Sequence, residues 1–83
     1  MILKILTPEK KIFEGSVDII TIPTSLGLIS ILNNHTPLVS NILPGEITVK
    51  YKDGEKIFNT ERGVVQTINN ETSLLLTKCS EKS

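Results

Sequence analysis

The 83-residue sequence contains no Trp and no Ala, and it has a single Cys and few aromatic side chains. Without Ala the chain lacks the best helix former, whereas its many Ile and Val residues, branched at Cβ, favour a pleated sheet. One Cys cannot form an internal disulfide, so Cys79 is expected to be a reduced thiol in a cytosolic protein. The composition therefore predicts an intracellular β protein without disulfides.

Charge of one sign is also missing, because nine basic residues balance nine acidic residues and both are scattered along the chain. Nucleic acid is not an expected partner, since binding it requires a concentrated basic face. No apolar run approaches the ~20 residues that span a bilayer, and residues 1–4 are too short for a signal peptide. A chain of this length has room for one small domain.

Turn residues divide the sequence into short segments, none of which is long enough for a well-capped helix. Asp53-Gly54 and Asn69-Asn70 tolerate positive φ in tight hairpins, so the second half is expected to be an antiparallel meander. The sandwich domain is expected to span residues 1–79, and the tail 80–83 is expected to fray. The predicted strands cover residues 2–6, 11–14, 17–22, 28–32, 46–51, 56–60, 62–68 and 72–78.

Alternation of side chains indicates which faces are buried. Ile47, Val49 and Tyr51 fall on one face of their strand, with Thr48 and Lys50 on the other. Residues 17–22 and 74–76 are apolar on both faces, as in strands between two sheets or beneath a partner. The predicted fold class is all-β, a small antiparallel β-sandwich or flattened barrel.

Residues suited to catalysis or metal binding are scarce. His35 is the only imidazole, which excludes a His-based triad or a multi-His metal site within one chain. Its polar loop leaves several roles open: an acid–base group, a metal ligand, a contact with a partner, or a local hydrogen bond. The glycines stand apart and form no phosphate-binding loop. No catalytic residue, metal ligand or cofactor site is therefore assigned.

Residues 22–28 place two leucines in turn-like surroundings, where polar residues are the norm. Exposure of Leu26 is favoured, and an exposed leucine there indicates docking. Leu28 either docks in the same way or folds back onto the sandwich as the start of the next strand.

Three segments together resemble the epsilon subunit of F-type ATP synthases. They are residues 6–15, residues 31–38 with Asn33-Asn34-His35, and residues 43–47 with Leu43-Pro44-Gly45, and they keep that family's order and spacing. The resemblance covers essentially the whole chain and implies a β-sandwich. It also implies a non-catalytic rotor subunit of the central stalk, which binds the gamma subunit and the c-ring to couple ion translocation to ATP synthesis.

The resemblance also implies where these partners bind and where the protein is located. It implies no cofactor and no small-molecule ligand. The protein would be peripheral to the membrane, on the cytoplasmic face of the bacterial inner membrane. The implied c-ring contacts are Thr24, Ser25, Leu26, Gly27, Leu28 and His35, and the implied gamma contacts are Leu38, Val39 and Phe58.

The sequence departs from the family's pattern in ways that change these expectations. Relatives often carry carboxylates at the positions of Leu26 and Leu28, so an apolar or backbone-mediated ring contact replaces the electrostatic one. Many relatives continue into a C-terminal helical hairpin that restrains ATP hydrolysis and in some binds ATP. Because the sequence ends at Ser83, we expect neither function here unless the sequence is a fragment.

Two rival functions are less well supported by the residues. A free β-sandwich that binds a sugar or another small molecule would normally use aromatic platforms, and three aromatic residues, Phe13, Tyr51 and Phe58, are few for that purpose. An enzyme would need a nucleophile paired with the lone His35. Co-purification with a multi-subunit ATPase would separate the rotor subunit from both rivals.

Overall fold

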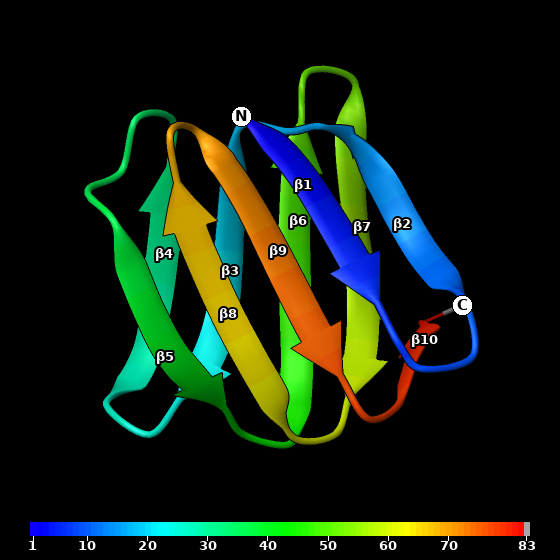
Figure 1. Cartoon of the computed structure of the whole chain (residues 1–83). Helices are drawn as coiled ribbons and strands as arrows, with labels where there is room; N and C mark the ends of the chain where they lie inside the picture. The colour runs from blue at the N-terminus through cyan, green and yellow to red at the C-terminus, as the bar shows by residue number, and fades with distance from the viewer. Residues whose placement is uncertain (83) are drawn as a thin grey trace.

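The computed structural model describes residues 1–82, and every regular element in this range is a β-strand (Figure 1). The all-β class predicted from composition is confirmed. The Cα trace measures 28 × 27 × 21 Å. The strands are β1 (Ile2–Leu6), β2 (Lys11–Ser16), β3 (Ile19–Thr24), β4 (Gly27–Leu32), β5 (Leu38–Ile42), β6 (Gly45–Tyr51), β7 (Gly54–Thr60), β8 (Gly63–Ile68), β9 (Glu71–Leu76) and β10 (Cys79–Glu81).

The strands form two layers that face each other (Figure 1). The front layer contains β5, β8, β9, β1 and β2, and the back layer contains β4, β3, β6, β7 and β10. Thr24 of β3 pairs with Ile42 of β5, which joins the two layers. The predicted sandwich is therefore also a flattened barrel. One pairing differs from the antiparallel prediction, because β1 runs parallel to β9.

The apolar core fills the space between the layers, and alternation along each strand produces it. Ile47 and Val49 are buried as predicted, while Tyr51 is half-buried at the end of β6. In β9, Leu74 and Leu76 point inward, whereas Leu75 remains 51% exposed on the outer face. The buried apolar residues are Met1, Leu3, Ile5, Val17, Ile20, Ile22, Ile31, Ile42, Ile47, Val49, Phe58, Val65, Leu74 and Leu76.

The tight turns agree with the sequence in one hairpin and differ in another. Asn69 and Asn70 adopt φ values of 52° and 60° between β8 and β9, which confirms the predicted left-handed turn. The turn between β6 and β7 forms at Lys52-Asp53, and neither Asp53 nor Gly54 adopts positive φ. That part of the prediction is wrong, although the hairpin itself is present.

Gly63 marks a close approach of β8 to β9. It pairs with Leu76 at the start of β8. A Cβ atom at this position would overlap the backbone carbonyl oxygen of Leu75 and lie 2.6 Å from Cδ2 of Leu76. Only a glycine lets the two strands meet here without displacement of the backbone.

The sequence did not predict β5 or β10. In β5, exposed Val39 and Asn41 alternate with half-buried Leu38 and Ser40, which gives a weak apolar pattern. The strand forms because β8 lies beside it over its whole length, from Leu38 opposite Thr67 to Ile42 opposite Gly63. Pairing with a distant segment decides the structure, and local propensity does not reveal it.

The predicted frayed tail is wrong for most of its length. Ser80 and Glu81 belong to β10, which pairs with β7 opposite Asn59 and Phe58. The backbone N–H of Lys82 donates to the carbonyl oxygen of Ile57 over 2.7 Å. Two ion pairs also hold the segment, Lys56–Glu81 at 3.6 Å and Lys82–Glu46 at 2.7 Å. Ser83 lies outside the described residues.

Candidate interaction surfaces

The turn between β3 and β4 presents an exposed leucine at its tip. Its backbone is held by the buried hydroxyl of Thr24, which donates to the carbonyl oxygen of Gly27 over 2.7 Å and accepts from the N–H of Leu26 over 3.2 Å. Gly27 has φ of 106°, a conformation that favours glycine. Leu26 is 86% exposed and Leu28 is 73% exposed. The turn is therefore a rigid support for two apolar side chains.

Leu28 is expected either to be exposed for docking or to fold back onto the sandwich as the start of the next strand, and the structure shows that its backbone and its side chain differ in this respect. Leu28 is the second residue of β4 and pairs with Pro23, so its backbone belongs to the sandwich. Its side chain points outward and remains largely exposed. Thr24, by contrast, is buried and contributes to this surface only by holding the turn.

His35 lies in the loop between β4 and β5, held by hydrogen bonds of the chain around it. Its N–H donates to the carbonyl oxygen of Leu32 over 3.2 Å, and its ring Nδ1 donates to the carbonyl oxygen of Thr36 over 2.6 Å. The N–H of Asn34 donates to Oδ1 of Asn70 over 2.7 Å, which ties this loop to the turn between β8 and β9. The imidazole is half-buried.

The structure separates the residues that the sequence grouped as one ring contact. Leu26 lies at one end of β4 and His35 follows the other end (Figure 1). Six strand residues at roughly 3.3 Å each put about 20 Å between the two ends. Leu26 and His35 therefore lie at opposite ends of β4, and a shared contact of both with the ring stays a prediction.

The three residues predicted to face a second partner differ in accessibility. Phe58 is 1% exposed, and its ring packs in the core against Phe13 with 5.9 Å between centroids. A partner cannot contact that side chain, so the prediction for Phe58 is wrong. Leu38 is half-buried against the core, whereas Val39 is 68% exposed on β5.

The outer face of the front layer carries an apolar row that the sequence did not reveal. Cross-strand pairing places Val64 beside Leu75, and Leu75 beside Leu6. Val39 lies on the same face, two positions before Asn41, which pairs with Val64. The signal for this row was the apolar outward position in each strand, but only the register shows that these positions are neighbours.

A shallow hollow lies at the end of this apolar row. Its volume is about 420 Å³. It is lined by Leu6, Thr7, Pro8, Leu75, Leu76 and Thr77.

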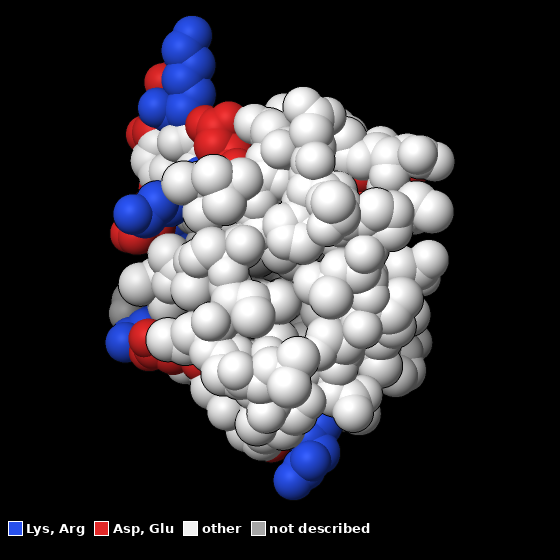
Figure 2. Space-filling model, turned by 90° about the vertical axis from the view of Figure 1, so that its left-hand side faces the viewer, with Lys and Arg blue, Asp and Glu red and all other residues white. Residues whose placement is uncertain are grey.

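The side of the molecule formed by β4 and β5 carries almost no charge. The sequence has no Lys, Arg, Asp or Glu between Asp18 and Glu46, a segment that includes both strands. Figure 2 shows this side as a broad uncharged surface with charged side chains at its rim. Exposed Leu28, Leu32 and Val39 belong to it. A partner can cover it without burying a charge.

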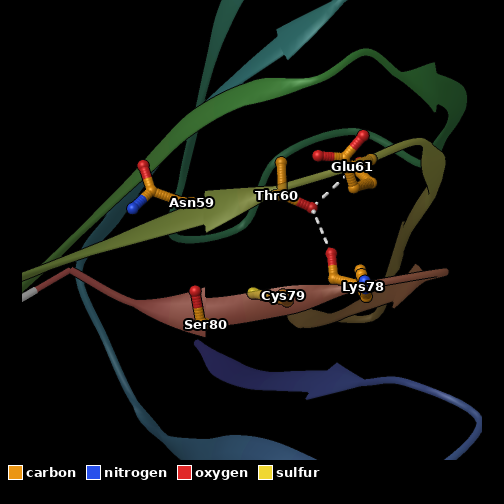
Figure 3. A pocket seen from close by; sticks show the side chains of 6 residues that line it. All are labelled: Asn59, Thr60, Glu61, Lys78, Cys79 and Ser80. Carbon is orange, nitrogen blue, oxygen red and sulfur yellow. Dashed lines mark hydrogen bonds between the residues drawn. The ribbon is translucent and has the colours of Figure 1, made fainter.

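A further hollow lies between the end of β7 and β10 (Figure 3). The hydroxyl of Thr60 is already used, because it donates to the carbonyl oxygens of Glu61 and Lys78 over 2.9 and 3.3 Å. Burial raises the pKa of the Cys79 thiol, so the reactive thiolate is disfavoured at neutral pH. Within residues 1–82 no group of His, Cys, Asp and Glu side chains has the arrangement of a metal site.

Comparison with known proteins decides the family. Residues 1–81 match the model of the ATP synthase delta/epsilon chain, β-sandwich domain. The chain belongs to this family. The resemblance carried by residues 6–15, 31–38 and 43–47 is thereby confirmed, and the chain corresponds to the N-terminal domain of the ATP synthase epsilon chain.

Individual relatives extend the same comparison. The chain is 34% identical over 77 residues to the ATP synthase epsilon chain of Bartonella quintana, covering 93% of this chain and 56% of the relative. It is 30% identical over 73 residues to that of Endomicrobium trichonymphae, covering 88% and 53%. The chain therefore spans about half the length of the curated relatives that it matches.

Two solved structures have the same fold. A chain of the Euglena gracilis mitochondrial ATP synthase, solved as OSCP/F1/c-ring, matches with a TM-score of 0.92 over 98% of this chain and 52% of its own length. A chain of the Tetrahymena thermophila mitochondrial ATP synthase central stalk and c-ring matches with a TM-score of 0.81 over 96% and 65%. Both are 20% identical to this epsilon-family chain, so the likeness concerns the fold. No helix among residues 1–82 is long and apolar enough to cross a membrane.

Proposed function

We propose that the chain is a non-catalytic rotor subunit of an F-type ATP synthase, which binds the gamma subunit and the c-ring and couples ion translocation to ATP synthesis. The main support is that exposed apolar side chains occupy two separate places, the row of Val39, Val64 and Leu75 on the front layer and the turn around Leu26. A subunit that links a shaft to a ring needs two such contacts. Membership of the ATP synthase delta/epsilon family supports the same assignment.

We assign the gamma contact to the apolar row on the outer face of the front layer, which runs from Val39 over Val64 and Leu75 to Leu6. These side chains project from neighbouring strands roughly 4.8 Å apart, so together they form a continuous apolar surface. Each such side chain contributes about 1.5–3 kcal/mol when a partner buries it completely. His35, at the far end of β4 from Leu26, is not assigned to this surface and stays a predicted contact with the ring.

We assign the c-ring contact to the turn at Ser25, Leu26 and Gly27, together with Leu28. The hydroxyl of Thr24 fixes the turn, so little conformational freedom is lost when Leu26 is buried. The ring lies in the membrane, which places this subunit at its periphery, on the cytoplasmic face of the inner membrane in a bacterium. The subunit acts mechanically through its contacts, without catalysis of its own.

The gamma contact is tested by the substitution Val39→Asp. An unpaired carboxylate buried in an interface costs at least about 3 kcal/mol, which lowers affinity for gamma by more than about a hundredfold. Asn59→Asp is the matched control, because it adds the same charge at an exposed side chain of β7, in the back layer. Calorimetric titration with the gamma subunit measures both variants, and a thermal melt confirms that each is folded.

The outcomes distinguish this proposal from its rivals. Weak binding by Val39→Asp together with normal binding by Asn59→Asp supports the assigned face. Equal affinity of the two variants would place the gamma contact elsewhere. If the wild-type chain binds neither gamma nor the c-ring, the rotor function itself is wrong.

A further inference from the structure

The edge of the back layer formed by β4 has no partner strand within the described residues. β4 pairs with β3 alone, through the register that joins Ile19 to Leu32 and Thr24 to Gly27. β4 follows the two-residue turn Ser25-Leu26. Because β3 lies along one edge of β4, the opposite edge of β4 faces outward, on the uncharged side of the molecule (Figure 1, Figure 2). An open strand edge is a template for pairing with another strand.

A hydrogen bond of β3 indicates which of its backbone groups face β4, and therefore which groups of β4 face outward. The carbonyl oxygen of Pro23 accepts from the N–H of Leu43, so Pro23 directs its backbone oxygen away from β4. Backbone groups alternate along an antiparallel strand, so it is Thr24, Ile22 and Ile20 that bond to β4.

The same alternation applies to β4 itself. The partners of those β3 residues, Gly27, Ile29 and Ile31, use their backbone groups toward β3. Leu28, Ser30 and Leu32 therefore present theirs at the open edge. The carbonyl oxygen of Leu32 agrees with this direction, since it accepts from the N–H of His35 and not from β3.

β4 also lacks the features that normally prevent edge pairing. Natural edge strands carry charges, proline or a bulge. β4 reads Gly-Leu-Ile-Ser-Ile-Leu, and its register with β3 contains no shift. Two other edge strands differ, because β2 carries the ion pair Lys11–Glu14 and β10 carries Glu81. β5 is also uncharged and pairs only with β8 over residues 38–41, so the absence of charge distinguishes β4 from β2 and β10 but not from β5.

We propose that β4 is a self-association site, at which two copies of this chain pair antiparallel through their β4 edges about a twofold axis at Ser30. This register places Ser30 opposite Ser30 of the second copy, and Leu28 opposite Leu32 of the second copy. The backbone groups of Leu28, Ser30 and Leu32 that face outward are thus all paired, because each of these residues lies opposite another residue whose backbone N–H and carbonyl oxygen also face the partner strand. The inference goes beyond the rotor function, and because the pairing buries Leu28, which the proposed ring contact also uses, the dimer is a state of the subunit that is not bound to the ring.

Side chains and charge favour a second copy as the occupant. On the outer face, Leu28 is 73% exposed and Leu32 is 51% exposed. The register brings Leu28 beside Leu32 of the second copy, and Leu32 beside Leu28 of the second copy. Cross-strand apolar pairs of this kind stabilise a sheet. The net charge is zero and β4 has no charged neighbour in residues 19–45, so two copies approach without electrostatic repulsion. The strand is complementary to itself.

Self-association is tested by sedimentation of the full chain over a wide concentration range. The wild type is expected to show a monomer–dimer equilibrium. Ser30→Lys places two ammonium groups directly opposite each other, which weakens dimerisation about tenfold or more. Gln66→Lys is the matched control, because it adds the same charge on exposed β8 away from the open edge. Thermal melts verify that both variants fold.

Disulfide cross-linking tests the register without depending on a charge, in a Cys79→Ser background. Residues in a directly opposite hydrogen-bonded pair have Cα atoms about 5.5 Å apart, which a disulfide spans. Ser30→Cys should therefore yield a covalent dimer on oxidation. Leu28→Cys is the control, because four residues of offset separate its two copies by about 14 Å, which is too far for a disulfide.

Three results would overturn the proposal. They are a chain that stays monomeric at the highest attainable concentration, a dimer that Ser30→Lys leaves unchanged, and cross-linking of Leu28→Cys as efficient as that of Ser30→Cys. A dimer lost on Leu75→Lys and retained by Ser30→Lys would assign self-association to the apolar face of the front layer instead. The gamma titration of Val39→Asp is independent of all these outcomes.

Discussion

Truncation of Leu26 to alanine probes the proposed contact with the c-ring. In the free subunit Leu26 is 86% exposed, so it contributes little to folding and its whole apolar surface is available to a partner. Leu26→Ala removes three carbon atoms, worth about 2 kcal/mol of burial, which corresponds to a roughly thirtyfold loss of affinity. An ion pair at the same exposed place would contribute only about 0–1 kcal/mol and would weaken with salt.

The assay is binding to the isolated c-ring, measured in a series from low salt to about 0.5 M, where exposed charges are strongly screened. The affinity of the wild type should change little across the series, and that of Leu26→Ala should be uniformly lower. Ile68→Ala is the control, because Ile68 is an exposed apolar residue at the end of β8, away from the turn. Thermal melts should give similar midpoints for all three proteins.

Two results would refute the reasoning about Leu26. Binding that disappears as salt rises would indicate an electrostatic contact, in which the leucine is incidental. Binding that tolerates Leu26→Ala as well as it tolerates Ile68→Ala would place the contact elsewhere on the subunit. Neither result decides the gamma contact, which the titration of Val39→Asp tests with a different partner and a residue of β5.

Two further predictions concern stability. Gly63→Ala should lower the free energy of unfolding by about 1–3 kcal/mol in urea denaturation, because its Cβ meets the backbone of β9; an unchanged midpoint would show that the strands separate freely there. Cys79, whose pKa burial raises, should add stability that is fully present below the ordinary thiol pKa and is lost as pH rises through the raised folded-state pKa. The stability difference between wild type and Cys79→Ser should therefore shrink from neutral to alkaline pH, and a constant difference would contradict this.

The fold class could be predicted because composition and alternation act locally. Ile47 and Val49 alternate with polar neighbours and are buried as that pattern requires. β5 and β10 escaped prediction because their partners are remote: Ser40 lies opposite Val65 and Ser80 lies opposite Asn59. Neither strand has an apolar pattern of its own that would identify it.

The candidate surfaces were predicted less completely, for a related reason. The exposure of Leu26 follows from a turn in the sequence, so local reasoning identified it. Phe58 was assigned to gamma from the family resemblance, and a matched position does not show which face of the strand its side chain takes. The link between Val64, Leu75 and Leu6 depends on the register of three strands, and register is not a local property.

The parallel pairing of β1 with β9 has a consequence for the order in which the molecule forms. Ile2 lies opposite Glu71, so β1 needs as its neighbour a strand that is synthesised much later than β1 itself. Until then β1 has only β2 beside it, and an isolated two-stranded unit is marginally stable in water. Leu3 and Ile5 therefore remain without their full set of neighbours until β9 has left the ribosome. Completion of the front layer is a late event in the biogenesis of this domain.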